Sequence, residues 1–194
     1  PAALLSSSSS LLLSLLLAQL PVFTSAFTTP RPFDKLSDKT RNLMRLTQEL
    51  LVREKHAIYP DVFQHRFQSL PEMSNRSAND LSNLELKSTL SQLHADLKMY
   101  KQHFEWLSNV LKKHHRPAAE KELVAIIEEV KSLLSMLERQ MLTAEAPRLT
   151  QATPSFSTHP TSHFDVLKSS KALLKHFKFY CDWASRAFIS LNQP

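Results

Sequence analysis

The stretch that decides the fold runs from residue 82 to residue 117 and reads SNLELKSTLSQLHADLKMYKQHFEWLSNVLKKHHRP. Its large apolar side chains recur at alternating spacings of four and three residues, at Leu86, Leu90, Leu93, Leu97, Tyr100, Phe104, Leu107 and Leu111. This spacing places them on one face of a long α-helix. Ser82 and Glu85 have the spacing of a capping box, and Pro117 cannot continue a helix. We therefore predict a helix from Ser82 to the residue before Pro117.

Three further stretches have the same helical periodicity. The first, about 34–56, buries Leu36, Leu43, Leu46 and Leu50. Another starts at Pro117, ends before Pro147 and buries Leu123, Ile126, Ile127, Val130, Leu133, Leu134, Leu137 and Met141. The last opens with Ser162 and Asp165 in capping-box spacing and buries Leu167, Ser170, Leu174, Phe177, Cys181, Ala184, Phe188 and Leu191. The chain therefore reads as all-α, with four helices.

The connections between these helices predict their directions. The second and third helices are joined by almost nothing, so they must be antiparallel neighbours. About thirty residues separate the first helix from the second, and about sixteen separate the third helix from the fourth. A loop of either length can return the chain along helices of roughly 35 Å. We predict an up-up-down-down long-chain four-helix bundle with two long crossover loops.

Composition excludes several kinds of chemistry. The 194 residues include no glycine and one cysteine, so the glycine-dependent phosphate loops, dinucleotide fingerprints, EF-hand loops and nucleophile elbows are absent. No catalytic constellation can be assembled, and we expect neither an enzyme nor a cofactor. His114 and His115 are the best metal candidates, but neighbouring helical side chains diverge by about 100°, which favours a solvated helix end over a metal site. Cys181, within an apolar stripe, is expected to be a buried inert thiol rather than a reactive one.

The first 26 residues carry no charge and end in small side chains, which is typical of a secretory signal peptide rather than a membrane span or an ordinary N-terminal helix. We expect residues 1–26 to be such a peptide, incomplete at its start, and residues 27–194 to form one secreted domain. The net charge of +6 suits extracellular acidic surfaces better than nucleic acid in a secreted protein. Asn75 begins an Asn-Arg-Ser glycosylation sequon.

The outward face of the last helix carries the candidate binding residues. At 100° per residue, Phe179 lies about 160° and Arg186 about 140° from Cys181, with Lys168 on the same side and Trp183 near the boundary. An aromatic beside a fixed cation is typical of an interface hot spot, although exposed aromatics are common and a loop could cover Trp183. The outer faces of the first and third helices offer weaker candidates, equally consistent with simple solvation: Arg41, Arg45, Val52, Glu128 and Arg139.

Specific residues resemble the interleukin-11 family. The matching pieces are Ser69-Leu70-Pro71, then Leu93-x-Ala95-Asp96-Leu97-x-x-Tyr100-x-x-His103-x-x-Trp106-Leu107, and Asp182-Trp183-Ala184-x-Arg186. Together they span most of the chain after the leader. The sequence departs from the mammalian pattern at Cys181, at the sequon, in lacking glycine and in carrying Phe164 where the family has Trp, which indicates a divergent, non-mammalian member.

This resemblance implies a secreted cytokine that binds a specific alpha receptor and the shared signal-transducing receptor of the interleukin-6 type through three surfaces. Arg186 falls at the helix arginine of the alpha-receptor surface, where Phe179, Trp183 and Lys168 would accompany it. Phe164 falls on the third surface, and the faces bearing Arg41, Arg45, Val52, Glu128 and Arg139 would form the second. We expect a free monomer that inserts into no membrane and binds no nucleic acid. The alternative is a secreted amphipathic-helix lipid-binding protein, since basic helices with leucine faces also bind membranes.

Overall fold

The computed structural model describes residues 31–53, 67, 69–73, 79–150 and 162–193, and every regular element within these ranges is helical. Four α-helices and one short 3-10 helix follow each other in the chain: α2 (Asp34–Arg53), η3 (Asn79–Asn83), α3 (Leu86–Lys113), α4 (Pro117–Ala144) and α5 (His163–Ser190). Two expectations, the signal peptide at 1–26 and the sequon at Asn75, lie outside the described residues.

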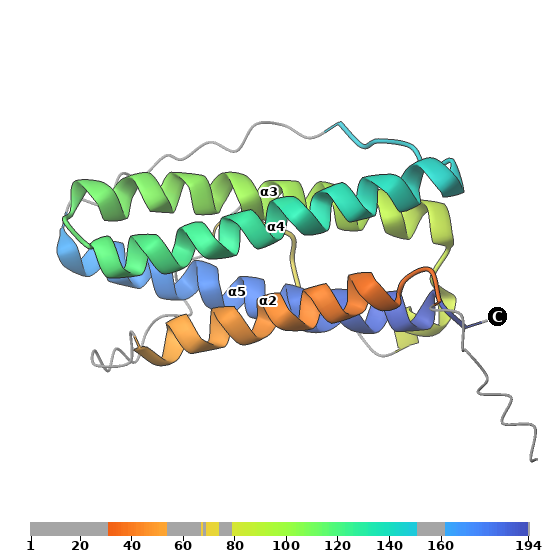
Figure 1. Cartoon of the computed structure of the whole chain (residues 1–194), viewed down its shortest axis with the longest axis horizontal. Coiled ribbons are helices and arrows are strands. Elements are labelled where there is room, and N and C mark those ends of the chain that lie inside the picture. Colours follow the sequence, from red (N-terminus) through yellow and green to blue (C-terminus); the bar gives the residue numbers. More distant parts are fainter. Residues whose placement is uncertain (1–30, 54–66, 68, 74–78, 151–161, 194) are drawn as a thin grey trace, which may run out of the picture. The chain divides into compact units, whose positions relative to one another are not determined.

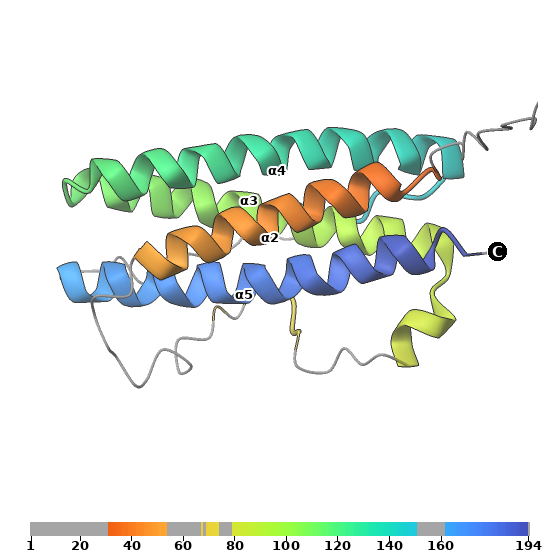
Figure 2. The same cartoon turned by 60° about the horizontal axis from the view of Figure 1, so that its bottom comes forward.

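The four α-helices form the predicted up-up-down-down bundle. Figure 1 shows α2 and α3 running in one direction and α4 and α5 running in the other. Around the bundle, α2 packs on α5, α5 on α3, α3 on α4 and α4 on α2, so every neighbouring pair is antiparallel. Figure 2 shows α2 lying between α4 and α5, with α3 behind. The parallel pair α2 and α3 lies across the diagonal, as two long crossovers require.

The start of α3 differs from the prediction. The helix begins at Leu86 rather than Ser82, because the carboxylate of Glu85 accepts the backbone N–H groups of Lys87 (3.1 Å) and Ser88 (2.7 Å) and so caps the helix itself. Ser82 lies in η3, where its hydroxyl donates to the carbonyl of Asn79 at 2.7 Å. The predicted start of the last helix is confirmed, because Ser162 and Asp165 form a capping box at the start of α5.

Aromatic side chains from α3 and α5 fill the centre of the core. Tyr100, Phe104, Phe177 and Tyr180 are all at most 1% exposed, and their ring centroids lie between 4.8 and 6.5 Å apart where they pair. The hydroxyl of Tyr180 donates to the carbonyl of Leu93 at 2.9 Å, so its polar end is satisfied inside the bundle. Because the one cysteine forms no cross-link, this packing holds the helices together.

Most of the predicted apolar stripes are buried, with a few departures. Leu86 is 38% exposed because it lies at the first residue of α3, and four further leucines are only partly covered: Leu46, Leu134, Leu167 and Leu191. On α2 the stripe also includes two buried threonines. The hydroxyls of Thr40 and Thr47 donate to the carbonyls one turn back at 2.7 Å, which satisfies them without a partner helix.

Part of the first crossover packs on the outside of α3. The ring of Phe67 lies edge-on to His103 at 5.5 Å and to Trp106 at 6.4 Å, and Leu70 is 8% exposed. The hydroxyl of Ser69 lies 2.8 Å from Nε2 of His103. Further along, the hydroxyl of Ser190 in α5 donates to the carbonyl of Leu81 in η3 at 2.6 Å. The crossover is thereby fastened to both α3 and the end of α5.

Candidate binding surfaces

The outward stripe of α5 carries three of the four predicted contact residues. Phe179 is 53% exposed, the side chain of Arg186 is half exposed and Lys168 is partly covered. Eleven residues separate Lys168 from Phe179 and seven separate Phe179 from Arg186, so all three lie within about 20° of one another around the helix. The stripe therefore presents an exposed aromatic ring between two cations.

Arg186 is held in place on this stripe by its own helix. Its guanidinium forms an ion pair with the carboxylate of Asp182, one turn back, at 2.5 Å. Asp182 was not among the predicted site residues, although its spacing of four residues from Arg186 is the usual signal for such a pair. The pair is exposed on both sides and contributes little to stability. Its main effect is to restrict the rotamers of the arginine before any partner arrives.

Trp183 does not share the outward stripe. Sequence reasoning placed it near the boundary, whereas the structure leaves it 7% exposed and includes it in the apolar core. A boundary position on the wheel of a single helix becomes an interior one when the neighbouring elements pack around that helix. Trp183 thus lies beneath the exposed stripe and is not part of it.

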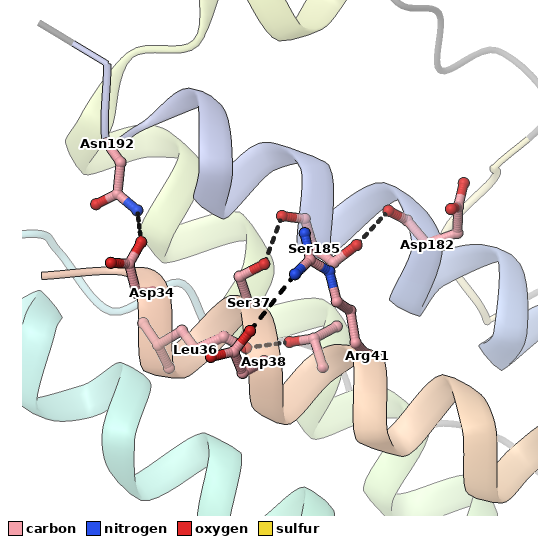
Figure 3. Close-up of polar contacts among 9 residues, drawn as sticks. Asp34, Leu36, Ser37, Asp38, Arg41, Asp182, Ser185 and Asn192 are labelled. Carbon is pink, nitrogen blue, oxygen red and sulfur yellow. Dashed lines mark hydrogen bonds and ion pairs between the residues drawn. The ribbon is translucent and has the colours of Figure 1, made fainter. Parts of the chain in front are cut away.

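Polar contacts join α2 and α5 along their seam (Figure 3). Ser37 of α2 donates to the carbonyl of Ser185 at 3.3 Å, and at the end of the seam the amide of Asn192 donates to Asp34 at 2.8 Å. Small serine side chains at 37 and 185 let the two helices approach closely. These two bonds fasten the last turns of α5, where Arg186 lies, to the start of α2.

A second face lies on the outside of α2 and α4. Its predicted residues are all exposed, with Val52 at 47%: Arg41, Arg45, Val52, Glu128 and Arg139. Arg45 donates to Glu49 at 2.6 Å and to Asn42 at 2.9 Å, while Glu128 accepts from Lys131 at 2.7 Å. Ion pairs between Lys39 and Glu129 and between Arg53 and Glu122 join the two helices. They make α2 and α4 one continuous outer face.

A third surface lies at the start of α5. Phe164 lies in the first turn, between the two capping-box residues Ser162 and Asp165, and is 44% exposed. A guanidinium nitrogen of Arg116, in the α3–α4 turn, lies 3.2 Å from the ring nitrogen of His163. The exposed aromatic therefore lies next to the turn between α3 and α4. Twenty-two residues separate it from Arg186, about 33 Å along the helix.

Other candidate chemistry gains no support from the described part of the chain. Among its residues no group of three or more His, Cys, Asp or Glu side chains could hold a metal ion, and no described helix is long and apolar enough to cross a membrane. Cys181 is fully buried, and burial, followed by the nearby Asp182 charge, raises the pKa of its thiol well above the usual value. A thiol in that environment is protonated and unreactive.

Comparison with known proteins gives two matches. Residues 25–194 match the profile of a family described as Interleukin 11. Interleukin-11 of Macaca fascicularis is 29% identical over 161 residues, which cover 79% of this chain and 76% of the relative. The matched region includes all four helices of the bundle and all three exposed surfaces.

Proposed function

Since the chain belongs to the interleukin-11 family of cytokines, we propose that it is a secreted ligand that acts by bringing receptors together through three separate surfaces. The family is one of cytokines rather than enzymes, and cytokine receptors are its partners in general. The finer assignment is that one surface binds a specific alpha receptor and two surfaces bind copies of the shared signal-transducing receptor. Secretion through residues 1–26 and glycosylation at Asn75 are part of the same proposal.

The observation that carries this proposal is the exposed stripe of α5. Phe179, Arg186 and Lys168 share one face of a helix whose other sides are covered by α2, α3 and η3. A half-exposed arginine beside an exposed aromatic is the composition of an interface hot spot. We assign this stripe to the alpha receptor, with Trp183 supporting α5 from the core below it. An acidic group on the receptor would replace or join Asp182 as the partner of Arg186.

Two other surfaces remain for the signal-transducing receptor. The joined outer face of α2 and α4 supplies the second surface, with Arg41, Arg45, Val52, Glu128 and Arg139 exposed on it. Phe164 and the adjoining α3–α4 turn supply the third.

The lipid-binding alternative finds less support, because the leucine faces that it would need are packed against each other inside the bundle. Flotation with liposomes distinguishes the two functions.

Replacing Arg186 by Ala tests the proposal. We expect the affinity for the soluble ectodomain of the alpha receptor to fall at least tenfold, because removing a central interface arginine costs about 2 kcal/mol or more. The thermal unfolding midpoint should stay the same, since the Arg186–Asp182 pair is exposed. Surface plasmon resonance gives the affinity and circular dichroism gives the midpoint.

The matched control is Arg148→Ala. Arg148, in the segment after α4, is also exposed and forms a distant ion pair of 3.8 Å with Glu138. Its loss removes the same charge and should leave receptor affinity unchanged. Equal affinities for the Arg186→Ala variant and the parent protein would refute the assignment of this stripe.

A further inference from the structure

One end of the bundle and the adjoining part of α5 carry the excess positive charge of the chain. The turn between α3 and α4 contributes Lys112, Lys113 and Arg116, with no acidic residue from 112 to 116. The first half of α5, residues 163–178, contributes four lysines against the single acid Asp165. Seven basic groups against one acidic group account for the full net charge of +6, so the remaining residues are balanced.

The fold brings these two segments together. Arg116 in the turn lies 3.2 Å from His163 in the first turn of α5, so the two segments meet at one end of the bundle. We call Lys112, Lys113, Arg116 and the four lysines of α5 the basic patch. Lys112 and Lys113 are exposed, and the others are partly exposed. Residues far apart in the sequence thus form one charged surface.

The four lysines of α5 lie in a line along the helix. At 100° per residue, Lys168, Lys171, Lys175 and Lys178 fall within a sector of about 80°, and they extend over about 15 Å of the helix axis. Beyond the start of this row, Arg116 of the turn meets the first turn of α5. A narrow row of cations matches a linear polyanion better than it matches a compact ligand with one or two negative groups.

We propose that the basic patch binds a sulfated polysaccharide. Clusters of lysine and arginine attract extended polyanions because their potentials add along the row and because bound counterions are released. An anionic membrane is the less suitable partner, since the large exposed apolar side chains described in or directly beside these two segments are Phe164 and Phe179, which lie about 22 Å apart along α5 and form no continuous apolar face. Such polysaccharides are extracellular, so a biological encounter rests on the proposed secretion. The binding itself is tested on purified protein and does not depend on any receptor.

The test compares two variants that lose the same charge. The patch variant replaces Lys112, Lys113 and Lys178 by Gln. The control variant replaces Lys35, Lys98 and Arg139 by Gln, three exposed cations outside the patch. Circular dichroism verifies that both variants fold, and the affinity for heparin is measured in solution at about 0.15 M salt, the physiological ionic strength.

We expect the patch variant to bind heparin at least tenfold more weakly than the parent, with a shallower dependence of affinity on salt, because fewer counterions are released. The control variant should stay within about twofold of the parent, since the charges that it loses are not in the row. Equal losses in both variants would show that only net charge matters and would overturn the proposal. So would failure of the parent to bind heparin at this salt concentration.

Two further ligands separate the possible polyanions. Vesicles containing phosphatidylserine should bind the parent more weakly than heparin does. Tighter binding to the vesicles, abolished in the patch variant, would assign the patch to a membrane instead. A desulfated heparin should also bind more weakly, and undiminished affinity for it would refute recognition of sulfate groups.

Discussion

Among the residues that the structure describes, two adopt a left-handed backbone conformation, and the sequence has no glycine to place there. His115, in the α3–α4 turn, has φ of 54°, and Glu145, at the end of α4, has φ of 53°. Helices commonly end with glycine in this conformation, because any residue with a Cβ atom is strained there by about 1 kcal/mol or more. Glu145 still closes α4, and its N–H and that of Ala146 bond to carbonyls of the last turn at 3.3 and 2.9 Å.

Replacing Glu145 by Gly should therefore stabilise the protein. We expect the free energy of unfolding to rise by about 1 kcal/mol, because glycine adopts the left-handed conformation without strain. Chemical denaturation with urea measures the change. The control is Glu145→Ala, which loses the same side chain and the same weak contact with Lys87 at 3.7 Å but keeps the strain. If both variants have the same stability, backbone strain at this residue is not significant.

His103 links the first crossover to α3 through both of its ring nitrogens. Its Nδ1 lies 2.8 Å from the carbonyl of Met99, which can only accept, so Nδ1 carries the hydrogen. In the neutral ring Nε2 then accepts from the hydroxyl of Ser69, at 2.8 Å. Burial lowers the pKa of His103, and burial also lowers the pKa of His176. Both imidazoles are neutral in the folded state over a wider pH range than in the unfolded chain.

The stability should therefore depend on pH in the mildly acidic range. Above the ordinary histidine pKa of 6.5 both rings are neutral in the folded and in the unfolded state. Titration of these two histidines then does not reduce the free energy of unfolding. As the pH falls below 6.5, the unfolded chain takes up protons that the folded state resists, and stability decreases. Urea unfolding at a series of pH values measures this slope. His103→Asn should reduce the slope without removing it, because His176 remains; an unchanged slope would contradict the role given to His103.

At the scale of the elements, the start of α3 depends on Glu85. Its carboxylate bonds to the N–H groups of Lys87 and Ser88, and the bonds with Ser88 lower the pKa of Glu85. We expect Glu85→Ala to lower the thermal unfolding midpoint, because two helix N–H groups lose their acceptor. Ser82→Ala should have a smaller effect, since the hydroxyl of Ser82 donates to Asn79 within the short η3 helix and not to the backbone of α3. A larger effect of Ser82→Ala in the same melting experiment would support the predicted capping box instead.

The sequence predicted the four helices because their apolar side chains recur at helical spacing over many turns. It predicted their directions because the α3–α4 turn is short and the other two connections are long. Three details needed the structure. Thr40 and Thr47 bury their hydroxyls by bonding to their own helix, Glu85 replaces Ser82 as the cap, and Trp183 becomes buried. Each depends on local bonds or on tertiary packing that periodicity does not reveal.

The candidate surfaces were more difficult to predict than the helices. Exposure on α5 followed from helical geometry, and Arg186 and Phe179 are exposed as expected. The wheel of one helix could not show that η3 covers part of α5, nor that the α3–α4 turn meets the first turn of α5. Those contacts join residues far apart in the chain. Which receptor binds each surface stays a prediction.

On the scale of the whole molecule, the proposed alpha-receptor stripe and the proposed third surface lie far apart. Phe164 and Arg186 are about 33 Å apart along α5, and their surroundings differ, because Phe164 lies near the α3–α4 turn whereas Arg186 lies beyond the middle of the α2–α5 seam. Sites at that distance without shared contacts are expected to act independently.

We therefore expect Phe164→Ala to preserve the affinity for the alpha receptor while reducing signalling. In the double variant with Arg186→Ala, the loss of alpha-receptor affinity should equal that of the single arginine variant within about 0.5 kcal/mol. Surface plasmon resonance measures the affinity, and a receptor-dependent reporter cell line measures signalling. Loss of alpha-receptor affinity in Phe164→Ala alone would show that the two surfaces are not separate.

The bond from Asn192 to Asp34 has a consequence for engineering the protein. The side-chain oxygen of Asn192 also accepts the N–H of Phe33 at 3.1 Å, so the beginning of α2 and the residues after α5 lie in direct contact. A short peptide could join these two places without stretching the bundle. The protein is thus a suitable template for circular permutation, with new termini opened between Arg53 and Phe67, and in such a rearranged chain α2 would follow α5 in the order of synthesis.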